Sequence, residues 1–248
     1  MTTYLDPDQA RHTLCDIGRR MWQRGFCAGN EGNLSVRLGP DRLLCTPSLM
    51  SKGFLEPDDL CVIDMHGDLV EPHPRGRKRT SEIRLHLAAY AKRDDVAAVI
   101  HAHPPHATAF ALLGIPLPQG VYPEAELFLG RVPVAPYATP GTPDLAVAVA
   151  SAVAPDTQAL LMASHGVMCL GRDPGDAYDK LEILDATCRI LTLAQQLGRP
   201  HVLDAQQMNA LLAAKRAFGQ TDARPDFPPD ADIPALSRDY FDRCPPTP

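Results

Sequence analysis

The residues best suited to chemistry in this chain are two histidines at the end of an apolar run. His101 and His103 follow residues 97–100, which have the composition of a short buried strand. Residues two apart in a strand point to the same face, so both imidazoles could bind one metal ion. The same pair could equally make ordinary hydrogen bonds at the mouth of a sheet. The pair alone therefore leaves both interpretations open.

A third histidine favours the metal site. His165 lies where a second apolar run, residues 159–164, ends, and the glycine after it lets the backbone approach the site closely. Three imidazoles are a ligand set that leaves one position of a catalytic metal open. Glu82, near the start of a predicted helix, could ligate that position or act as a base. The alternative for Glu82 is a surface carboxylate at the positive end of the helix.

An alternation of strands and helices must position these residues. Apolar residues at helical spacing, with capping residues and prolines at the ends, predict helices at 8–26, from Thr80 or Ser81 onward, from 105, from 143, at 174–197 and at 204–219. Apolar runs predict strands at 34–38, 42–46, 97–103, 132–136, 159–164 and 166–170, and a β-ribbon at 60–70. The first strand alternates apolar and polar residues, as a half-buried strand does. Hairpins mixed with helical crossovers predict an α/β fold with a mixed, largely antiparallel central sheet between helical layers.

Length and composition favour one folded domain. The chain has 248 residues, of which 45% are hydrophobic and 22% charged, enough to bury a large core. We expect one domain over residues 1–223. Residues 224–248 are rich in proline, which interrupts helices and central strands, so we expect an extended or disordered tail there.

The charge and cysteine patterns exclude several classes of partner. The net charge is -6 and the basic residues are scattered, which predicts no binding to nucleic acid or to a membrane surface and favours a small-molecule substrate. Lys52 and the basic residues of the stretch 75–79 could attract an anion or form a solvated surface. No signal peptide or spanning segment is visible, so we expect a cytoplasmic protein. The seven cysteines contain no C-x-x-C pair and predict reduced, mostly buried thiols.

Six ordered motifs accompany the histidines and together resemble the class II aldolase/adducin family, over roughly residues 8 to 200. This group includes L-fuculose-1-phosphate aldolase, L-ribulose-5-phosphate 4-epimerase and methylthioribulose-1-phosphate dehydratase. The motifs are Gly32-Asn33-Leu34-Ser35, Thr46-Pro47-Ser48, Thr80-Ser81-Glu82, His101-x-His103-x-x-His106, Pro136-Tyr137-Ala138-Thr139 and His165-Gly166.

The resemblance implies a fold, a cofactor and an assembly. Its fold, a mixed sheet between helical layers, agrees with the pattern above, and its members usually form C4-symmetric homotetramers with active sites between subunits. The metal is normally Zn²⁺, with Mn²⁺ or Co²⁺ as alternatives, and the implied ligands are His101, His103 and His165. Contacts to a substrate phosphate are implied for Gly32, Asn33, Ser48, Thr80 and Ser81, which offer hydroxyl, amide and backbone N–H donors.

Two residues depart from the family pattern at these contacts. The aldolases commonly continue Thr-Pro-Thr/Ser with glycine, whereas this chain has Leu49 there, and Asn30 stands where threonine is frequent. A glycine N–H can approach a phosphate more closely than that of leucine. The substrate itself is therefore left open by the sequence.

The activity implied by the resemblance is reversible retro-aldol cleavage of a ketose 1-phosphate to dihydroxyacetone phosphate and an aldehyde, through a metal-stabilised enediolate. Glu82 would shuttle the donor proton. Counting back without gaps from Pro136-Tyr137-Ala138 places Tyr122 where the aldolases carry a tyrosine that reaches the neighbouring subunit's site and exchanges a proton with the aldehyde oxygen. The alternative for Tyr122 is a loop residue packing an interface. His106 is expected to support the ligands or the fold instead of binding the metal.

Other activities within and outside this lyase class remain alternatives. Epimerases of the family tend to carry aspartate at the position of Glu82, which disfavours epimerisation. A methylthioribulose-1-phosphate-type dehydratase or a 3-oxo sugar acid phosphate decarboxylase would use the same electron sink. An adducin-like, non-catalytic interaction module is the alternative from another class, but such a module has no reason to keep three histidines and a glutamate together.

Overall fold

A computed structural model describes residues 4–243 and contains one seven-stranded sheet with the order β3-β2-β1-β4-β7-β6-β5. Every neighbouring pair is antiparallel except β5 and β6, which are parallel. The predicted mixed, largely antiparallel sheet is therefore confirmed. The strands are β1 (Asn33–Arg37), β2 (Arg42–Cys45), β3 (Cys61–Asp64), β4 (Ala98–Ala102), β5 (Val134–Ala135), β6 (Ala159–Met162) and β7 (Gly166–Gly171).

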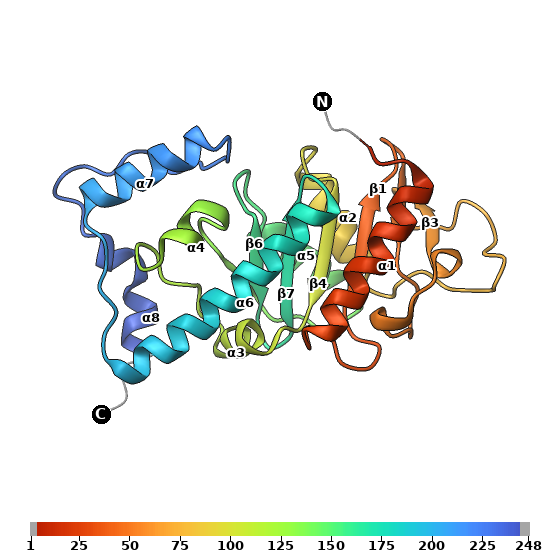
Figure 1. Ribbon diagram of the computed structural model, residues 1–248, viewed down its shortest axis with the longest axis horizontal. Coiled ribbons are helices and arrows are strands. Elements are labelled where there is room, and N and C mark those ends of the chain that lie inside the picture. The colour runs from red at the N-terminus through yellow and green to blue at the C-terminus, as the bar shows by residue number, and fades with distance from the viewer. Residues whose placement is uncertain (1–3, 244–248) are drawn as a thin grey trace.

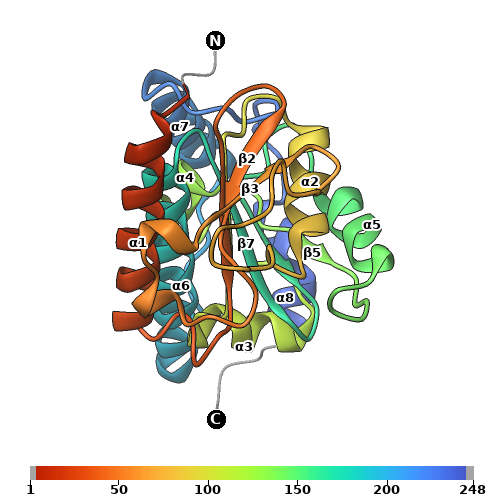
Figure 2. The ribbon, with the colours of Figure 1, turned by 90° about the vertical axis from the view of Figure 1, so that its right-hand side faces the viewer.

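Helices cover both faces of the sheet. Figure 2 shows α1 (Pro7–Gln23) and α6 (Pro174–Leu197) on one face, with α2 (Ile83–Lys92) and α5 (Pro143–Ala152) on the other. One apolar core lies under α1, α6 and α3 (Pro105–Leu113), and a second lies under α2 and α5. Because both faces are covered, neighbouring residues of one strand, such as Ile100 and Val99, enter different cores. The sandwich of helical layers is as predicted.

The prediction that the first strand is half-buried is wrong. All residues of β1 are buried, including Ser35 and Arg37 on the face that alternation would assign to solvent. The Arg37 guanidinium donates hydrogen bonds to the carbonyl oxygens of Tyr90 and Val96, and the Ser35 hydroxyl contacts His86 and Tyr90. A strand can bury its polar face when a helix carrying hydrogen-bonding partners covers that face.

Two other local predictions need correction. The helix expected to be capped by Thr80 or Ser81 begins at Ile83, and Glu82 occupies its N-cap position. The β-ribbon expected at 60–70 is reduced to β3 and an isolated bridge between Ile63 and Leu69. In contrast, α6 ends at Leu197 and is followed by Gly198, as predicted.

The segment after α6 carries further helices at the end of the molecule away from β3 (Figure 1). These elements are α7 (Ala205–Ala217), the 3₁₀ turn η3 (Ile233–Ser237) and α8 (Arg238–Arg243). Ile233 and Tyr240 are buried, and the Tyr240 ring stacks on Phe110 of α3 at 6.1 Å between centroids. The prediction of an extended or disordered tail is therefore wrong for residues 233–243, while residues 244–248 lie outside the described part. The domain boundary at residue 223 stays a prediction.

Smaller elements complete the chain. The 3₁₀ turns η1 (Lys52–Phe54) and η2 (Pro57–Asp59) follow β2, and α4 (Pro123–Phe128) lies between α3 and β5. All six cysteines among residues 4–243 are buried and free, as expected. No helix in that range combines the length and apolar composition needed to cross a bilayer.

Candidate metal centre

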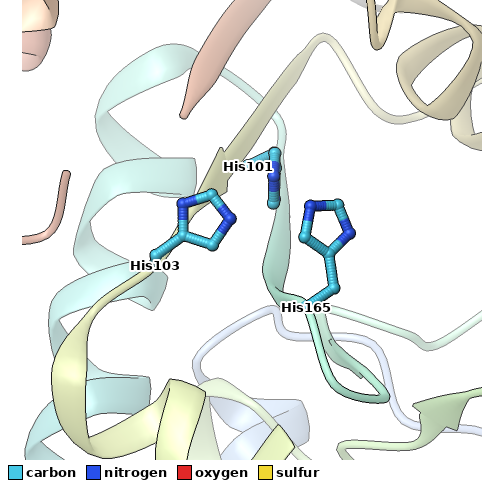
Figure 3. Close-up of side chains that lie close together, drawn as sticks. All are labelled: His101, His103 and His165. Atoms are coloured by element: carbon cyan, nitrogen blue, oxygen red, sulfur yellow. The ribbon is translucent and has the colours of Figure 1, made fainter. Parts of the chain in front are cut away.

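Three strand ends bring the histidines together. His101 lies within β4, paired with Asn33 of β1 and Met168 of β7, and His103 follows directly after that strand. His165 lies in the turn between β6 and β7. The three rings converge in Figure 3, with centroids 4.7 to 5.4 Å apart. Residues more than sixty positions apart in the sequence thus share one site.

Gly166 allows this approach, as the sequence predicted. A Cβ atom at this position would lie 2.6 Å from Cδ2 of His103 and 2.7 Å from the carbonyl oxygen of Ala102. Both distances are far below van der Waals contact, so any side chain here would push the two histidine-bearing strands apart.

The nitrogen atoms of the three rings fit a divalent metal ion. One ligand nitrogen from each ring lies within 4.8 Å of the others. Nδ1 of His101 lies 2.8 Å from the carbonyl oxygen of Val167, which can only accept, so Nδ1 carries the proton and Nε2 presents its lone pair. Within residues 4–243, the buried ring atoms Nε2 of His101, Nδ1 of His103 and Nδ1 of His165 have no hydrogen-bond partner. Buried nitrogens without protein partners are what a metal would satisfy.

Burial keeps two of these rings in the form that binds metals. Desolvation is the largest cause that lowers the pKa of His103 to about 3 and that of His165 to about 4. Both imidazoles are therefore neutral near neutral pH. Only the neutral ring has a lone pair free for a metal ion.

Glu82 places a carboxylate directly beside two of the rings. Its Oε2 lies 3.3 Å from Nε2 of His101 and its Oε1 lies 3.4 Å from Nε2 of His165. The Asn33 side-chain amide donates a hydrogen bond of 2.9 Å to Oε2. Burial acts to raise the pKa of Glu82, but polar contacts that include the hydrogen bond from Asn33 outweigh it and hold that pKa below its usual range. The carboxylate is therefore ionised and can ligate a metal or accept a proton.

The predicted phosphate contact at Ser48 has its donors engaged within the chain. Its N–H donates to the carbonyl oxygen of Lys78 at 2.8 Å, and its hydroxyl donates to that of Arg79 at 2.9 Å. The neighbouring Leu49 has a φ of 60° and a side chain that is 84% exposed. A left-handed φ is the conformation that favours glycine, so Leu49 holds a strained backbone conformation.

The other predicted phosphate contacts differ in whether their hydrogen-bond donors are already engaged within the chain. The Thr80 N–H donates to the carbonyl oxygen of Thr46 at 3.0 Å, and its hydroxyl oxygen accepts from the N–H of Glu82 at 3.3 Å. Ser81 is exposed, and among the described residues its hydroxyl makes no hydrogen bond. Gly32 has a φ of 73°, and a Cβ atom at this position would lie 3.0 Å from the carbonyl oxygen of His101. Ser81 is therefore the contact whose hydroxyl can donate to an anion with the least rearrangement.

Tyr122 and His106 interact with carboxylates other than that of Glu82. Tyr122 occupies the N-cap position of α4, where burial and Glu124 raise its pKa above the ordinary value. Across residues 4–243, no hydrogen bond or ion pair joins Tyr122 to the three histidines. His106 instead pairs with Asp185, with Nδ1 at 3.0 Å from Oδ2, and its backbone N–H donates to the same carboxylate.

Sequence reasoning missed two buried residues beside this site. Lys52, expected either to attract an anion or to be solvated, is buried, and its ammonium donates to the carbonyl oxygens of Asn30 and Met50. Burial lowers the pKa of Lys52 to about 8. His86, also fully buried, contacts Asn33. Its spacing of four residues from Glu82 on one helix was the available signal, because such residues share a helix face.

Comparison with known proteins agrees with the motifs and the fold. The family model described as Class II Aldolase and Adducin N-terminal domain matches residues 12–192. A 5-methylthioribulose-1-phosphate/5-deoxyribulose-1-phosphate aldolase from Rhodospirillum rubrum is 34% identical over 218 residues, covering 88% of this chain and 96% of the relative. A 3-oxo-tetronate 4-phosphate decarboxylase from Haemophilus influenzae is 34% identical over 189 residues, covering 75% of this chain and 88% of the relative.

A solved structure supports the same assignment. An L-fuculose 1-phosphate aldolase superposes with a TM-score of 0.76 at 32% sequence identity, covering 84% of this chain and 96% of that one. The matched family model spans all three histidines and Glu82. This chain therefore belongs to the class II aldolase and adducin family.

Proposed function

We propose that this protein is a zinc-dependent lyase that cleaves a ketose 1-phosphate into dihydroxyacetone phosphate and an aldehyde by a reversible retro-aldol reaction. The observation that carries the proposal is the ionised Glu82 carboxylate within 3.4 Å of Nε2 of both His101 and His165, in a site where one buried nitrogen of each of the three imidazoles has no hydrogen-bond partner. An interaction module would gain nothing from a buried carboxylate and three orphaned imidazole nitrogens, each of which costs free energy.

Zinc is the ion that an all-imidazole donor set favours, with Mn²⁺ and Co²⁺ as alternatives. His101, His103 and His165 would hold it. The bound ion would polarise the substrate's carbonyl and hydroxyl oxygens and stabilise the negative charge that develops when the carbon–carbon bond breaks. Glu82 is ionised, so in the condensation direction it can accept the proton that leaves the donor carbon, and in cleavage it returns that proton to the same carbon.

We propose that the phosphate of the substrate binds over the loops that carry Gly32, Asn33, Ser48, Thr80 and Ser81. The exposed Ser81 hydroxyl supports this, and so does Asn33, whose amide nitrogen has a second hydrogen besides the one donated to Glu82. For Ser48 to take part, its hydroxyl must leave the carbonyl oxygen of Arg79. Phosphate oxygens are strong acceptors, which makes that exchange favourable.

Tyr122 is proposed to exchange a proton with the aldehyde oxygen in the site of a neighbouring subunit, donating it in condensation and taking it back in cleavage. Its raised pKa keeps the phenol protonated at neutral pH, as this role requires. The proposal needs an assembly, because among the described residues no hydrogen bond or ion pair joins Tyr122 to the histidines of its own chain. We propose a homotetramer with active sites between subunits, which light scattering on the purified protein would test.

Decarboxylation is the second candidate. The Haemophilus influenzae decarboxylase is as similar in identity as the Rhodospirillum rubrum aldolase, although it covers less of this chain. Both reactions leave electrons on a carbon next to a carbonyl group, so the same metal and Glu82 would serve either. The aldolase is favoured because that relative matches 88% of this chain, whereas the decarboxylase matches 75%.

The test uses metal-loaded protein and a panel of phosphorylated substrates. We expect 5-deoxyribulose 1-phosphate, 5-methylthioribulose 1-phosphate or L-fuculose 1-phosphate to release dihydroxyacetone phosphate, detected through an NADH-linked reporter. Glu82→Gln should abolish the signal without releasing the metal. Carbon dioxide from a 3-oxo sugar acid phosphate would indicate the decarboxylase, and elimination of water without triose phosphate would indicate a dehydratase. Absence of all three reactions would overturn the proposal.

A further inference from the structure

A chain of buried polar groups leads from the interior of the protein to Glu82. The Tyr90 hydroxyl lies 2.9 Å from the Ser35 hydroxyl, which lies 2.7 Å from Nδ1 of His86. Nε2 of His86 lies 2.5 Å from Oδ1 of Asn33, whose Nδ2 donates to Glu82 at 2.9 Å. We call this hydrogen-bonded chain from Tyr90 to Glu82 the relay. Except for Glu82, every residue in it is at most 4% exposed.

Chemistry fixes the direction of every hydrogen bond in the relay. The ionised Glu82 can only accept, so the Asn33 amide must turn its nitrogen toward Glu82 and its oxygen toward His86. His86 must then donate from Nε2, which leaves Nδ1 as an acceptor for the Ser35 hydroxyl. Ser35 in turn accepts from the Tyr90 hydroxyl. Each donor therefore points toward the carboxylate.

Both elements that hold the relay are firmly anchored. Asn33 and Ser35 lie two apart on β1 and so point to one face of the sheet, which α2 covers with His86 and Tyr90. At the far end the Arg37 guanidinium stacks on the Tyr90 ring at 4.6 Å and donates to the Tyr90 carbonyl oxygen. The His86 imidazole of α2 is therefore held against β1.

We propose that His86 is a positioning residue that fixes the Asn33 amide and, through it, the orientation of the Glu82 carboxylate between His101 and His165. The inference rests on the proposed function, in which Glu82 moves the proton. Without the Nε2 donor, nothing holds the Asn33 oxygen away from Glu82. The amide can then rotate, and Glu82 loses the hydrogen bond that keeps Oε2 beside His101. Substitution of a hydrogen-bond partner that orients the groups around a metal typically lowers activity by about 10- to 100-fold.

The first test compares two substitutions at one position. His86→Leu removes the donor, while His86→Gln places an amide N–H where Nε2 donates now. We expect kcat to fall about 10- to 100-fold in His86→Leu and to recover most of that loss in His86→Gln. Gln158→Leu is the matched control, because it removes a buried hydrogen bond to Lys180 at the opposite end of β6 and should lower the melting temperature without this loss of kcat.

A double-variant cycle separates positioning from a general loss of stability. If His86 acts through Asn33, the variant with both His86→Leu and Asn33→Ala should be no slower than Asn33→Ala alone. If the losses of kcat in the two single variants multiply in the double variant, the proposal is overturned. Equal kcat values for His86→Leu and His86→Gln would also overturn it. If His86→Leu does not fold, Ser35→Ala serves instead, because it frees Nδ1 and should give a smaller loss of the same kind; an unchanged kcat there would also contradict the relay.

A readout without substrate keeps this proposal distinct from the proposed function. In proton–nitrogen correlation spectra of the metal-free protein, the Asn33 side-chain amide signals should shift and exchange faster with water in His86→Leu than in the wild type. His86→Gln should restore them. If the wild type turns over no compound yet these signals respond, the function is wrong and the relay stands. Unchanged Asn33 signals in His86→Leu would refute the relay whatever the activity.

Discussion

Acid should destabilise the metal-free protein steeply, because three imidazoles are buried in the neutral form. Burial lowers the pKa of His86 and His103 to about 3 and that of His165 to about 4, whereas in the unfolded chain each titrates near 6.5. Between the folded and unfolded pKa values the unfolded state binds more protons than the folded state. The contribution of these imidazoles to the free energy of unfolding is therefore fully present above pH about 6.5 and is lost as the pH falls toward 4.

The size of the effect follows from the number of groups. One proton difference changes the free energy of unfolding by about 1.4 kcal/mol per pH unit, so the three imidazoles together give about 4 kcal/mol per pH unit near pH 5. A domain of ordinary stability has about 5–15 kcal/mol in total. The metal-free protein should therefore lose most of its stability within two or three pH units below neutrality.

Urea unfolding of chelator-treated protein at a series of pH values measures this slope. His86→Gln removes one of the three groups and should reduce the slope by about 1.4 kcal/mol per pH unit. His201→Gln, which replaces an exposed histidine, is the control and should leave the slope unchanged. A wild-type slope below about 1.4 kcal/mol per pH unit, or an unchanged slope in His86→Gln, would contradict the burial of three neutral imidazoles.

Three further perturbations test the metal site, the strained loop and the C-terminal segment. Zn²⁺ at about 1,000 times its Kd should raise the free energy of unfolding by about 4 kcal/mol in thermal denaturation, and His101→Ala should abolish this gain while His106→Ala keeps it. Leu49→Gly should leave the free energy of unfolding in urea unchanged or raise it by up to about 1 kcal/mol, because relief of the left-handed φ offsets the extra freedom of glycine in the unfolded chain. A clear loss of unfolding free energy would contradict the strain at Leu49. Arg224→Met strands the buried partners Glu126 and Asp222, paired at 2.6 and 2.7 Å, and should cost about 3–5 kcal/mol, whereas the exposed Arg238→Met should cost less than about 1 kcal/mol.

Local pattern was sufficient for the sheet and for the histidine trio. The period of two places His101 and His103 on one face, and strand ends tend to carry site residues, so His165 could be added from its place after an apolar run. The start and end of α6 followed from Pro174 and Gly198, since capping depends on residues adjacent in sequence. The motifs that resembled the family then connected the trio to Glu82.

Local pattern failed wherever a partner distant in sequence decided the outcome. Alternation showed that Ser35 shares a face with Asn33, but not that α2 would bury that face and connect both to His86, 53 positions after Asn33. The basic Lys52 was indistinguishable from a solvated lysine until two backbone carbonyl oxygens enclosed it.

The same limit applies to the C-terminal segment and to the anion contacts. Proline content argued for a tail, yet Arg224 pairs with Glu126 across the fold and Tyr240 packs on α3. Ser48 carries the hydroxyl that the family motif requires, but only the folded chain brings the carbonyl oxygen of Arg79 to it. Residue type and spacing determined which groups could do chemistry, because both are local. The tertiary structure decided which of them are buried, neutral or engaged, because desolvation and hydrogen bonding depend on neighbours that the sequence does not place.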